Sequence, residues 1–173
     1  MGQAANPRLA SFRPSTYVRI LAFETSGRHG SLALLEGDQS GHAALRKETW
    51  LPRDQRTAQC LAPLMQQTLA EVDWNPSSLE LIAVTQGPGS FTGLRIGVTT
   101  AKTLAYATGA KLVGVSTLSV LASHAQIEYG RVWAALDAQR GELFAQAYDF
   151  NAGFALAPDE TRILSVEGWL QEL

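Results

Sequence analysis

Three short β-type segments follow one another near the start of the chain and give way to a helical period. The β-type segments are Tyr17–Glu24, Ser31–Glu36 and His42–Trp50, with glycine-bearing turns between them. Strands spaced this closely predict an antiparallel meander. From Asp54 to Asp73 apolar residues recur every three or four positions, which predicts one face of a helix. The first part of the chain therefore predicts a small antiparallel sheet with the apolar face of a helix packed on it.

A strand, a loop rich in glycine and a second helix come next. Leu79–Thr85 predicts the strand, GPGSFTGLR at residues 87–95 forms the loop, and Leu94–Thr108 predicts the helix, which Gly109 ends. Crossovers through helices join parallel strands, whereas the first three strands are antiparallel. The predicted order is therefore βββαβα, with a mixed sheet.

Shorter segments in the last third of the chain predict a second set of strands. They are a strand at Leu112–Val115, a helix that Ser116 caps, a hairpin made by Val132–Asp137 and Leu143–Tyr148, a weaker strand at Thr161–Val166 and a helical start at Glu167–Leu173. Together with the first sheet, these segments predict an α/β protein whose sheets are covered by helices.

Size and composition limit what the chain can be. Its 173 residues, 46% of them hydrophobic and 17% charged, suffice for one compact domain or two small lobes that share a core. The net charge of −2 provides no basic stripe for nucleic acid, and no apolar run approaches the ~20 residues of a membrane span. A single cysteine, Cys60, fits a reducing compartment, so we expect a cytoplasmic protein. We expect residues 1–15, which are polar and contain prolines, to form a mobile leader.

The glycine-rich loop allows two interpretations. A helix N-terminus offers free N–H groups and a partial positive charge, and Gly87, Gly89 and Gly93 would let a phosphate approach the backbone. Arg95 would add a charge. The spacing, however, matches neither the dinucleotide-binding fingerprint nor the P-loop. The other interpretation, which spacing alone favours, is a tight turn that seats the second helix closely against the sheet.

Other residues with useful chemistry are few. Glu24, Thr25 and Ser26 end the first strand, where a carboxylate and two hydroxyls suit hydrated Mg²⁺ or a phosphate but also suit the capping of a turn, which is the simpler interpretation. The three histidines fall in separate predicted elements, and no His-x-x-x-His pair exists. The sequence therefore indicates no metal site and no catalytic residue.

The first helix has an outer side with few charges. Ala58, Leu61, Met65 and Leu69 predict its buried stripe. Five residues on the far side include a single charge, and they are Arg56, Cys60, Pro63, Leu64 and Gln67. Surface that is poor in charge suits a partner helix better than water, so this side is a candidate interface. Ordinary surface with scattered apolar residues is an equal alternative.

Six short motifs occur in a fixed order along the chain. They are ILAFETS at 20–26, SLALL at 31–35, GPGSFTGLRIG at 87–97, AKTLA at 101–105, GVSTL at 114–118 and DAQRGE at 137–142. This ordered set resembles the bacterial TsaB family, also called YeaZ, over about residues 17–150. The GPGSFTGLR stretch is distinctive by itself.

The resemblance implies the actin/sugar-kinase/Hsp70 (ribonuclease H-like) fold of two related α/β lobes. These would be residues 16–111 and a shortened second lobe at 112–173, because members of the family continue for a few dozen residues more. The resemblance also implies a scaffold subunit that has no catalytic residues and needs no metal or cofactor. Weak binding of ATP or ADP with Mg²⁺ would be the one exception.

The same resemblance implies the partners of such a subunit. It would pair with the catalytic TsaD subunit and with TsaE, and would form a homodimer through first-lobe helices when alone. The complex makes N6-threonylcarbamoyladenosine at position 37 of tRNAs that read ANN codons, and the chain would meet tRNA only through that complex. The candidate interface on the first helix lies where the family's dimer contact should fall.

One departure from the family bears on the glycine-rich loop. The first strand of the family usually ends in Asp-Thr-Ser, whereas this chain has Glu24, whose extra methylene moves the carboxylate by ~1.5 Å. We therefore expect a vestigial phosphate or nucleotide loop made of Glu24, Thr25, Ser26, Gly87, Gly89, Ser90, Gly93 and Arg95. The alternative is a small sugar-kinase-like enzyme that binds a nucleotide or phosphate with this loop. No protease site supports the older glycoprotease label of the family.

Overall fold

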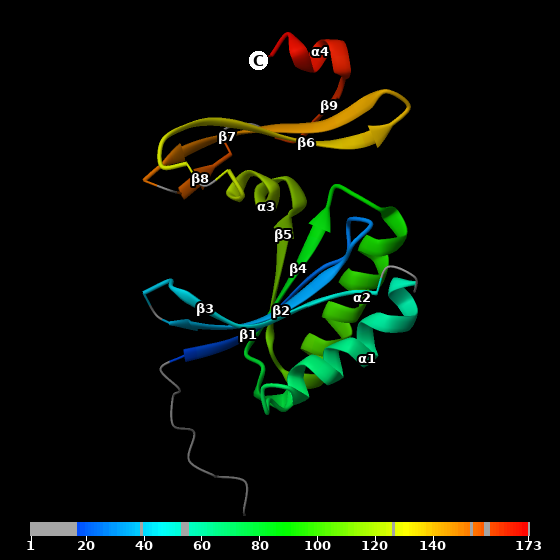
Figure 1. The fold of residues 1–173 in the computed structure, drawn as a ribbon, viewed down its shortest axis with the longest axis vertical. Coiled ribbons are helices and arrows are strands. Elements are labelled where there is room, and N and C mark those ends of the chain that lie inside the picture. The colour runs from blue at the N-terminus through cyan, green and yellow to red at the C-terminus, as the bar shows by residue number, and fades with distance from the viewer. Residues whose placement is uncertain are drawn as a thin grey trace, which may run out of the picture.

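The structure is a computed structural model that describes residues 17–38, 40–52, 56–125, 127–152, 154–157 and 160–172. Helix α3 (Thr117–Ser123) joins a larger sheet, which carries two long helices, to a smaller sheet (Figure 1). The predicted leader, residues 1–15, lies outside the described residues. The arrangement confirms the predicted mixed α/β class.

The first sheet has the strand order β3-β2-β1-β4-β5. Its strands are β1 (Tyr17–Glu24), β2 (Ser31–Asp38), β3 (Ala43–Trp50), β4 (Leu81–Gly87) and β5 (Lys111–Ser116). The first three pair antiparallel because short turns join them, while β4 and β5 run parallel to their neighbours. This confirms the predicted βββαβα order. Because β5 belongs to this sheet, the two sheets divide after Ser116 and not after residue 111.

Two helices, α1 (Thr57–Ala70) and α2 (Phe91–Thr108), cover one face of this sheet (Figure 1). Helix α1 runs unbroken through Pro63, and the short 3₁₀ turn η1 (Pro76–Ser78) leads from it to β4. Helix α2 begins before the predicted Leu94, because the Ser90 side chain accepts a hydrogen bond from the Gly93 N–H at 3.3 Å and caps the helix.

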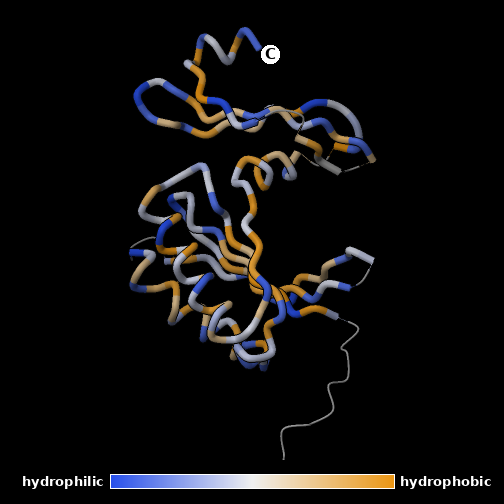
Figure 2. The backbone as a smooth tube through the Cα atoms, turned by 180° about the vertical axis from the view of Figure 1, so that it is seen from behind, coloured by the Kyte–Doolittle hydropathy of each residue, from blue (hydrophilic) through white to orange (hydrophobic). Residues whose placement is uncertain are grey.

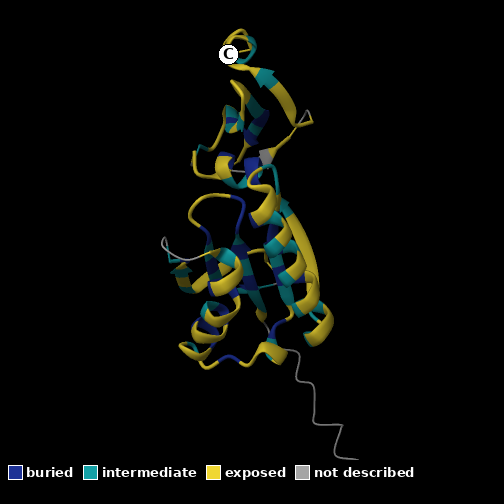
Figure 3. Cartoon of the chain, turned by 90° about the vertical axis from the view of Figure 1, so that its right-hand side faces the viewer, coloured by how far each residue is buried: buried dark blue, intermediate teal, exposed yellow. Residues whose placement is uncertain are grey.

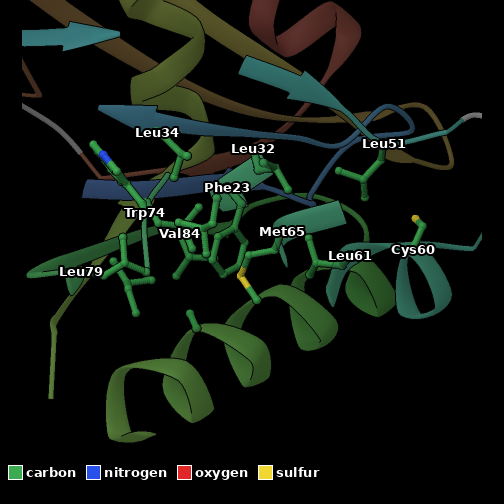
Figure 4. Packing of buried hydrophobic residues seen from close by; sticks show 14 residues of the cluster. Phe23, Leu32, Leu34, Leu51, Cys60, Leu61, Met65, Trp74, Leu79 and Val84 are labelled. Atoms are coloured by element: carbon green, nitrogen blue, oxygen red, sulfur yellow. The ribbon is translucent and has the colours of Figure 1, made fainter. Parts of the chain in front are cut away.

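Large apolar side chains fill the layer between this sheet and its helices. Alternate residues of β1, β2 and β4 point into it and are at most 3% exposed, namely Leu21, Phe23, Leu32, Leu34, Ile82 and Val84. Helix α1 adds Leu61 and Met65, and Figure 4 shows Met65 beside Phe23 and Val84. Because both helices bury an apolar side here, this layer is the main core of the protein.

The other face of the first sheet carries smaller apolar side chains. Ala33, Ala22 and Ala83 lie in register on β2, β1 and β4. Helix α3 approaches this face through Val120, which together with the three alanines lines a pocket of about 170 Å³. Figure 2 shows how hydrophobic the middle of this sheet is. Apolar residues on both faces explain why β1 reads as a central strand.

The second sheet contains β6 (Gly130–Gln139), β7 (Glu142–Asn151), β8 (Phe154–Leu156) and β9 (Arg162–Ser165), and is followed by the short helix α4 (Val166–Leu170). Strands β6 and β7 form the predicted antiparallel hairpin, and β8 and β9 both pair with β7. Helix α3 packs Leu118 and Ala122 against Ala134, Tyr148 and Phe150. This second, smaller cluster gives the second sheet a core of its own.

We expect Leu61→Ala to lower the free energy of unfolding by about 2–5 kcal/mol, because the Leu61 side chain is 2% exposed and its loss leaves a cavity. Gln59→Ala is the matched control, since Gln59 is exposed on the same helix, and it should change stability by less than about 0.5 kcal/mol. Urea denaturation followed by circular dichroism measures both. Equal losses of unfolding free energy in the two variants would contradict the placement of Leu61 in the core and of Gln59 at the surface.

Candidate functional site

The turn after β1 is the place where most of the predicted loop residues meet. Glu24 ends β1, and its Oε1 accepts hydrogen bonds from the Ser26 N–H and from Thr85 Oγ1, the latter at 3.1 Å. Thr85 belongs to β4, so the Glu24 carboxylate links the ends of the parallel strands β1 and β4. Thr25 and Ser26 are only 2% and 5% exposed. The first part of the turn is thus buried, whereas residues 27–29 are exposed.

The glycine-rich loop closes onto this turn from the end of β4. Gly87 and Gly89 have φ values of 114° and 153°, which favour glycine. The Ser90 N–H donates a hydrogen bond to the Ser26 carbonyl oxygen at 2.7 Å. The Ser90 N–H, which could otherwise bind an anion, is therefore already hydrogen-bonded within the protein.

Three glycines spaced four residues apart bring the start of α2 against the same turn. A Cβ at Gly89 would lie 2.6 Å from the Cβ of Ser26. A Cβ at Gly93 would overlap the carbonyl oxygen of Thr25, and one at Gly97 would overlap its hydroxyl. That hydroxyl is buried and has no hydrogen-bond partner among the residues that the structure describes. The glycines therefore serve close packing, as the favoured interpretation of the loop requires, and phosphate binding stays a prediction.

Arg95 points away from this cluster. Its guanidinium lies over the Phe91 ring, 5.3 Å from the ring centroid, and Phe91 is 73% exposed. The pair stands on the outer side of α2. Arg95 is therefore exposed on α2 beside Phe91, and its predicted part in an anion site stays a prediction.

Sequence reasoning missed three residues of this cluster. Thr85 comes from β4, and Thr117 of α3 donates a hydrogen bond from Oγ1 to Ser26 Oγ at 3.3 Å. Gly97 is the third. Its position, four residues after Gly93 and eight after Gly89, is a signal that could have revealed it, because residues at that spacing share one side of a helix. No local signal marks the two threonines.

The predicted interface on α1 requires a correction. Cys60 was expected on the outer side but is 5% exposed and packs in the core (Figure 4). Leu64 is half-buried against the same core. The buried side is rotated relative to the prediction, because Ala58 is exposed whereas Thr68 is buried. The Thr68 hydroxyl forms hydrogen bonds with the Leu64 carbonyl oxygen at 2.8 Å and with the hydroxyl of Thr49 on β3 at 3.1 Å.

The outer side of α1 agrees with the prediction only in part: Arg56, Pro63 and Gln67 are exposed as expected. It contains only uncharged side chains, which are Ala58, Gln59, Ala62, Pro63, Gln66, Gln67 and Ala70. We refer to these residues as the α1 outer side. Figure 3 shows the outward sides of both long helices as exposed.

Titratable groups with shifted pKa values lie away from the turn. A hydrogen bond from Lys47 lowers the pKa of Glu71, and Arg131 lowers that of Asp149 in the same way. Burial raises the pKa of Tyr148. Over the described ranges, no group of three or more His, Cys, Asp and Glu side chains is arranged to hold a metal ion. Within those ranges, too, every helix is either too short or too polar to cross a membrane.

Comparison with known proteins decides the family. A family model described as TsaD, tRNA N6-adenosine threonylcarbamoyltransferase, matches residues 54–158, which is more than half of the chain. The solved structure of YeaZ from Pseudomonas aeruginosa is 32% identical and superposes with a TM-score of 0.72, over 85% of this chain and 67% of its own. The chain belongs to the TsaB/YeaZ family. This likeness confirms the predicted mixed α/β fold.

Curated members of the TsaB/YeaZ family agree. TsaB of Bacillus subtilis (strain 168) is 33% identical over 156 residues, which are 89% of this chain and 65% of the relative. TsaB of Escherichia coli (strain K12) is 36% identical over 134 residues, which are 76% of this chain and 55% of the relative. Both are named tRNA threonylcarbamoyladenosine biosynthesis proteins. The chain thus spans less than two-thirds of the length of either relative.

We expect Gly97→Ala to destabilise the protein by about 1–3 kcal/mol, because the new methyl group meets the Thr25 hydroxyl. Thr25→Ala removes that hydroxyl and should restore most of the loss in the double variant. Gly93→Ala meets the Thr25 carbonyl oxygen, which remains in Thr25→Ala, so no rescue is expected there. Urea denaturation of the single and double variants checks this pattern, and rescue of Gly93→Ala would refute it.

Proposed function

We propose that the chain is a non-catalytic scaffold subunit that partners the catalytic TsaD subunit, together with TsaE. The complex would form N6-threonylcarbamoyladenosine at position 37 of tRNAs that read ANN codons. The names of the curated relatives place the family in tRNA threonylcarbamoyladenosine biosynthesis, and the matching TsaD family model supports kinship with the proposed partner. We further propose that the protein works in the cytoplasm, forms a homodimer when alone and meets tRNA only through the complex.

The observation that carries this proposal is the lack of charge on α1. None of its 14 residues is charged, although one side of the helix faces solvent. Helices at the surface of globular proteins usually carry charged residues on that side. Alanine and glutamine side chains can be covered by a partner without the cost of desolvating charges. The α1 outer side therefore suits a lasting protein contact.

The packing at the β1 turn supports a non-catalytic role. The Glu24 carboxylate holds Ser26 and Thr85, and the Ser90 N–H is bonded to the turn. Two backbone N–H groups that a sugar-kinase-like enzyme could offer to a phosphate, those of Ser26 and Ser90, are thus already bonded within the protein.

Isothermal titration calorimetry with ATP and Mg²⁺ separates the scaffold from the enzyme alternative. We expect binding weaker than about 1 mM, because a ligand would have to replace hydrogen bonds within the turn. Tight binding that Glu24→Ala abolishes would favour the nucleotide-binding enzyme.

We expect Ala62→Glu to weaken binding to TsaD at least about tenfold, because the carboxylate would have to be desolvated in a contact without charge. Ala157→Glu, at an exposed alanine of the second sheet region, is the matched control and should leave binding unchanged. Co-purification and titration with the cognate TsaD measure both. Absence of association between the unaltered, folded proteins at micromolar concentration would overturn the proposed function.

A further inference from the structure

The pocket of about 170 Å³ lies on the face of the first sheet that α1 and α2 do not cover. Its floor is a row of three alanines in register on neighbouring strands, Ala33 on β2, Ala22 on β1 and Ala83 on β4. Alanine side chains are short, so they leave a hollow that larger residues would fill. Val115 of β5 and Val120 of α3 add apolar walls. The floor and the walls therefore suit an apolar group.

The next row of side chains on the same face is polar. Because side chains of a strand alternate between its two faces, the pocket meets Ser31, Glu24 and Thr85 two positions beyond the alanines, beside the carboxyl ends of β1 and β4. Of the described residues that line the pocket, Glu24 alone carries a charge. Open α/β sheets bind ligands beyond the carboxyl ends of their parallel strands. The pocket thus combines apolar walls with a single carboxylate at one end.

The two oxygens of the Glu24 carboxylate have different surroundings. Its Oε1 accepts hydrogen bonds from the Ser26 N–H and from Thr85 Oγ1. Among the residues that the structure describes, none donates a hydrogen bond to Oε2, and no cationic side chain forms an ion pair with this carboxylate. Glu24 is half-buried. Two donors therefore hold its negative charge in place, while Oε2 stays available to a ligand.

We propose that this pocket binds a small apolar amine in its ammonium form. The ammonium group would donate a charge-assisted hydrogen bond to Glu24 Oε2, and the apolar part would lie on the alanine floor. An apolar cavity of about 150 Å³ in another protein holds a benzene ring, so the ligand has about the size of one ring with a short side chain. Such a ligand would bind whether or not the chain assembles with TsaD.

Two other kinds of ligand complement the pocket less well. Hydrated Mg²⁺ requires several oxygen ligands, whereas most of the lining residues are apolar. An anion would bring a negative charge toward Glu24, and the Ser26 and Ser90 N–H groups are already bonded within the protein. A cation with an apolar body matches both the charge at one end of the pocket and the apolar lining of the rest.

Titration with three ring compounds of similar size tests the charge preference. Benzylamine is a cation, benzyl alcohol is neutral and benzoate is an anion. The amide signals of Ala22, Ala33 and Ala83 in heteronuclear NMR spectra report binding at the pocket. We expect benzylamine to bind with a dissociation constant of about 0.1–1 mM and at least about tenfold more tightly than benzyl alcohol, and benzoate to leave these signals unchanged.

Three results of this titration would overturn the proposal. They are equal affinity for benzylamine and benzyl alcohol, no binding of benzylamine up to about 10 mM, and signal shifts confined to residues outside the pocket.

Two variants separate the carboxylate from the apolar floor. Glu24→Gln keeps an acceptor for Ser26 and Thr85 but removes the charge, so benzylamine should then bind no more tightly than benzyl alcohol. Ala33→Leu fills the floor and should weaken both ligands at least about tenfold. Ala44→Leu, at an exposed alanine of β3, is the matched control and should change neither.

Circular dichroism establishes that each variant is folded. Benzylamine affinity that is unchanged in folded Glu24→Gln protein would refute the role of the carboxylate. If Glu24→Gln does not fold, Ala33→Leu and the comparison of the charged and neutral ligands on the unaltered protein still decide between binding at this pocket and its absence.

Discussion

The close contact between α2 and the turn after β1 organises the rest of the structure. Gly93 and Gly97 let the helix touch Thr25, and the Ser90 N–H fastens the loop to Ser26. The same turn reaches β4 through Glu24 and α3 through Ser26. The tripeptide Glu24–Ser26 therefore contacts a helix, the neighbouring strand and the link to the second sheet. A side chain at either glycine would disturb all three together.

The position of α2 in turn decides what the surface offers. With its small residues against the sheet, the helix presents Phe91, Arg95, Lys102 and Tyr106 outward. Its neighbour α1 presents alanine, glutamine and proline. Small residues of α2 thus pack inside, and uncharged or cationic and aromatic side chains lie outside. Under the proposed function, the outward sides of the two helices would meet the partner subunit.

The sequence predicted the features that depend on local pattern. It did not predict the features that depend on contacts between elements. The order of the elements along the chain, both long helices and the loop followed from period and spacing. The side of α1 that carries Cys60 did not, because the rotation of the helix is set by contacts such as Thr68 with Thr49 on β3. Thr85 and Thr117 reach the turn from 61 and 91 positions away in the chain, so no local pattern could have placed them there.

Burial of Cys60 has a chemical consequence for the whole chain. It is the only cysteine of the sequence, and it lies on the buried side of α1 in the main core. Alkylating or oxidising reagents reach this thiol only when the helix lifts from the sheet. The rate of labelling at the Cys60 sulfur therefore measures how often the core opens. In the closed protein, copies of the chain have no surface thiol through which they could become cross-linked.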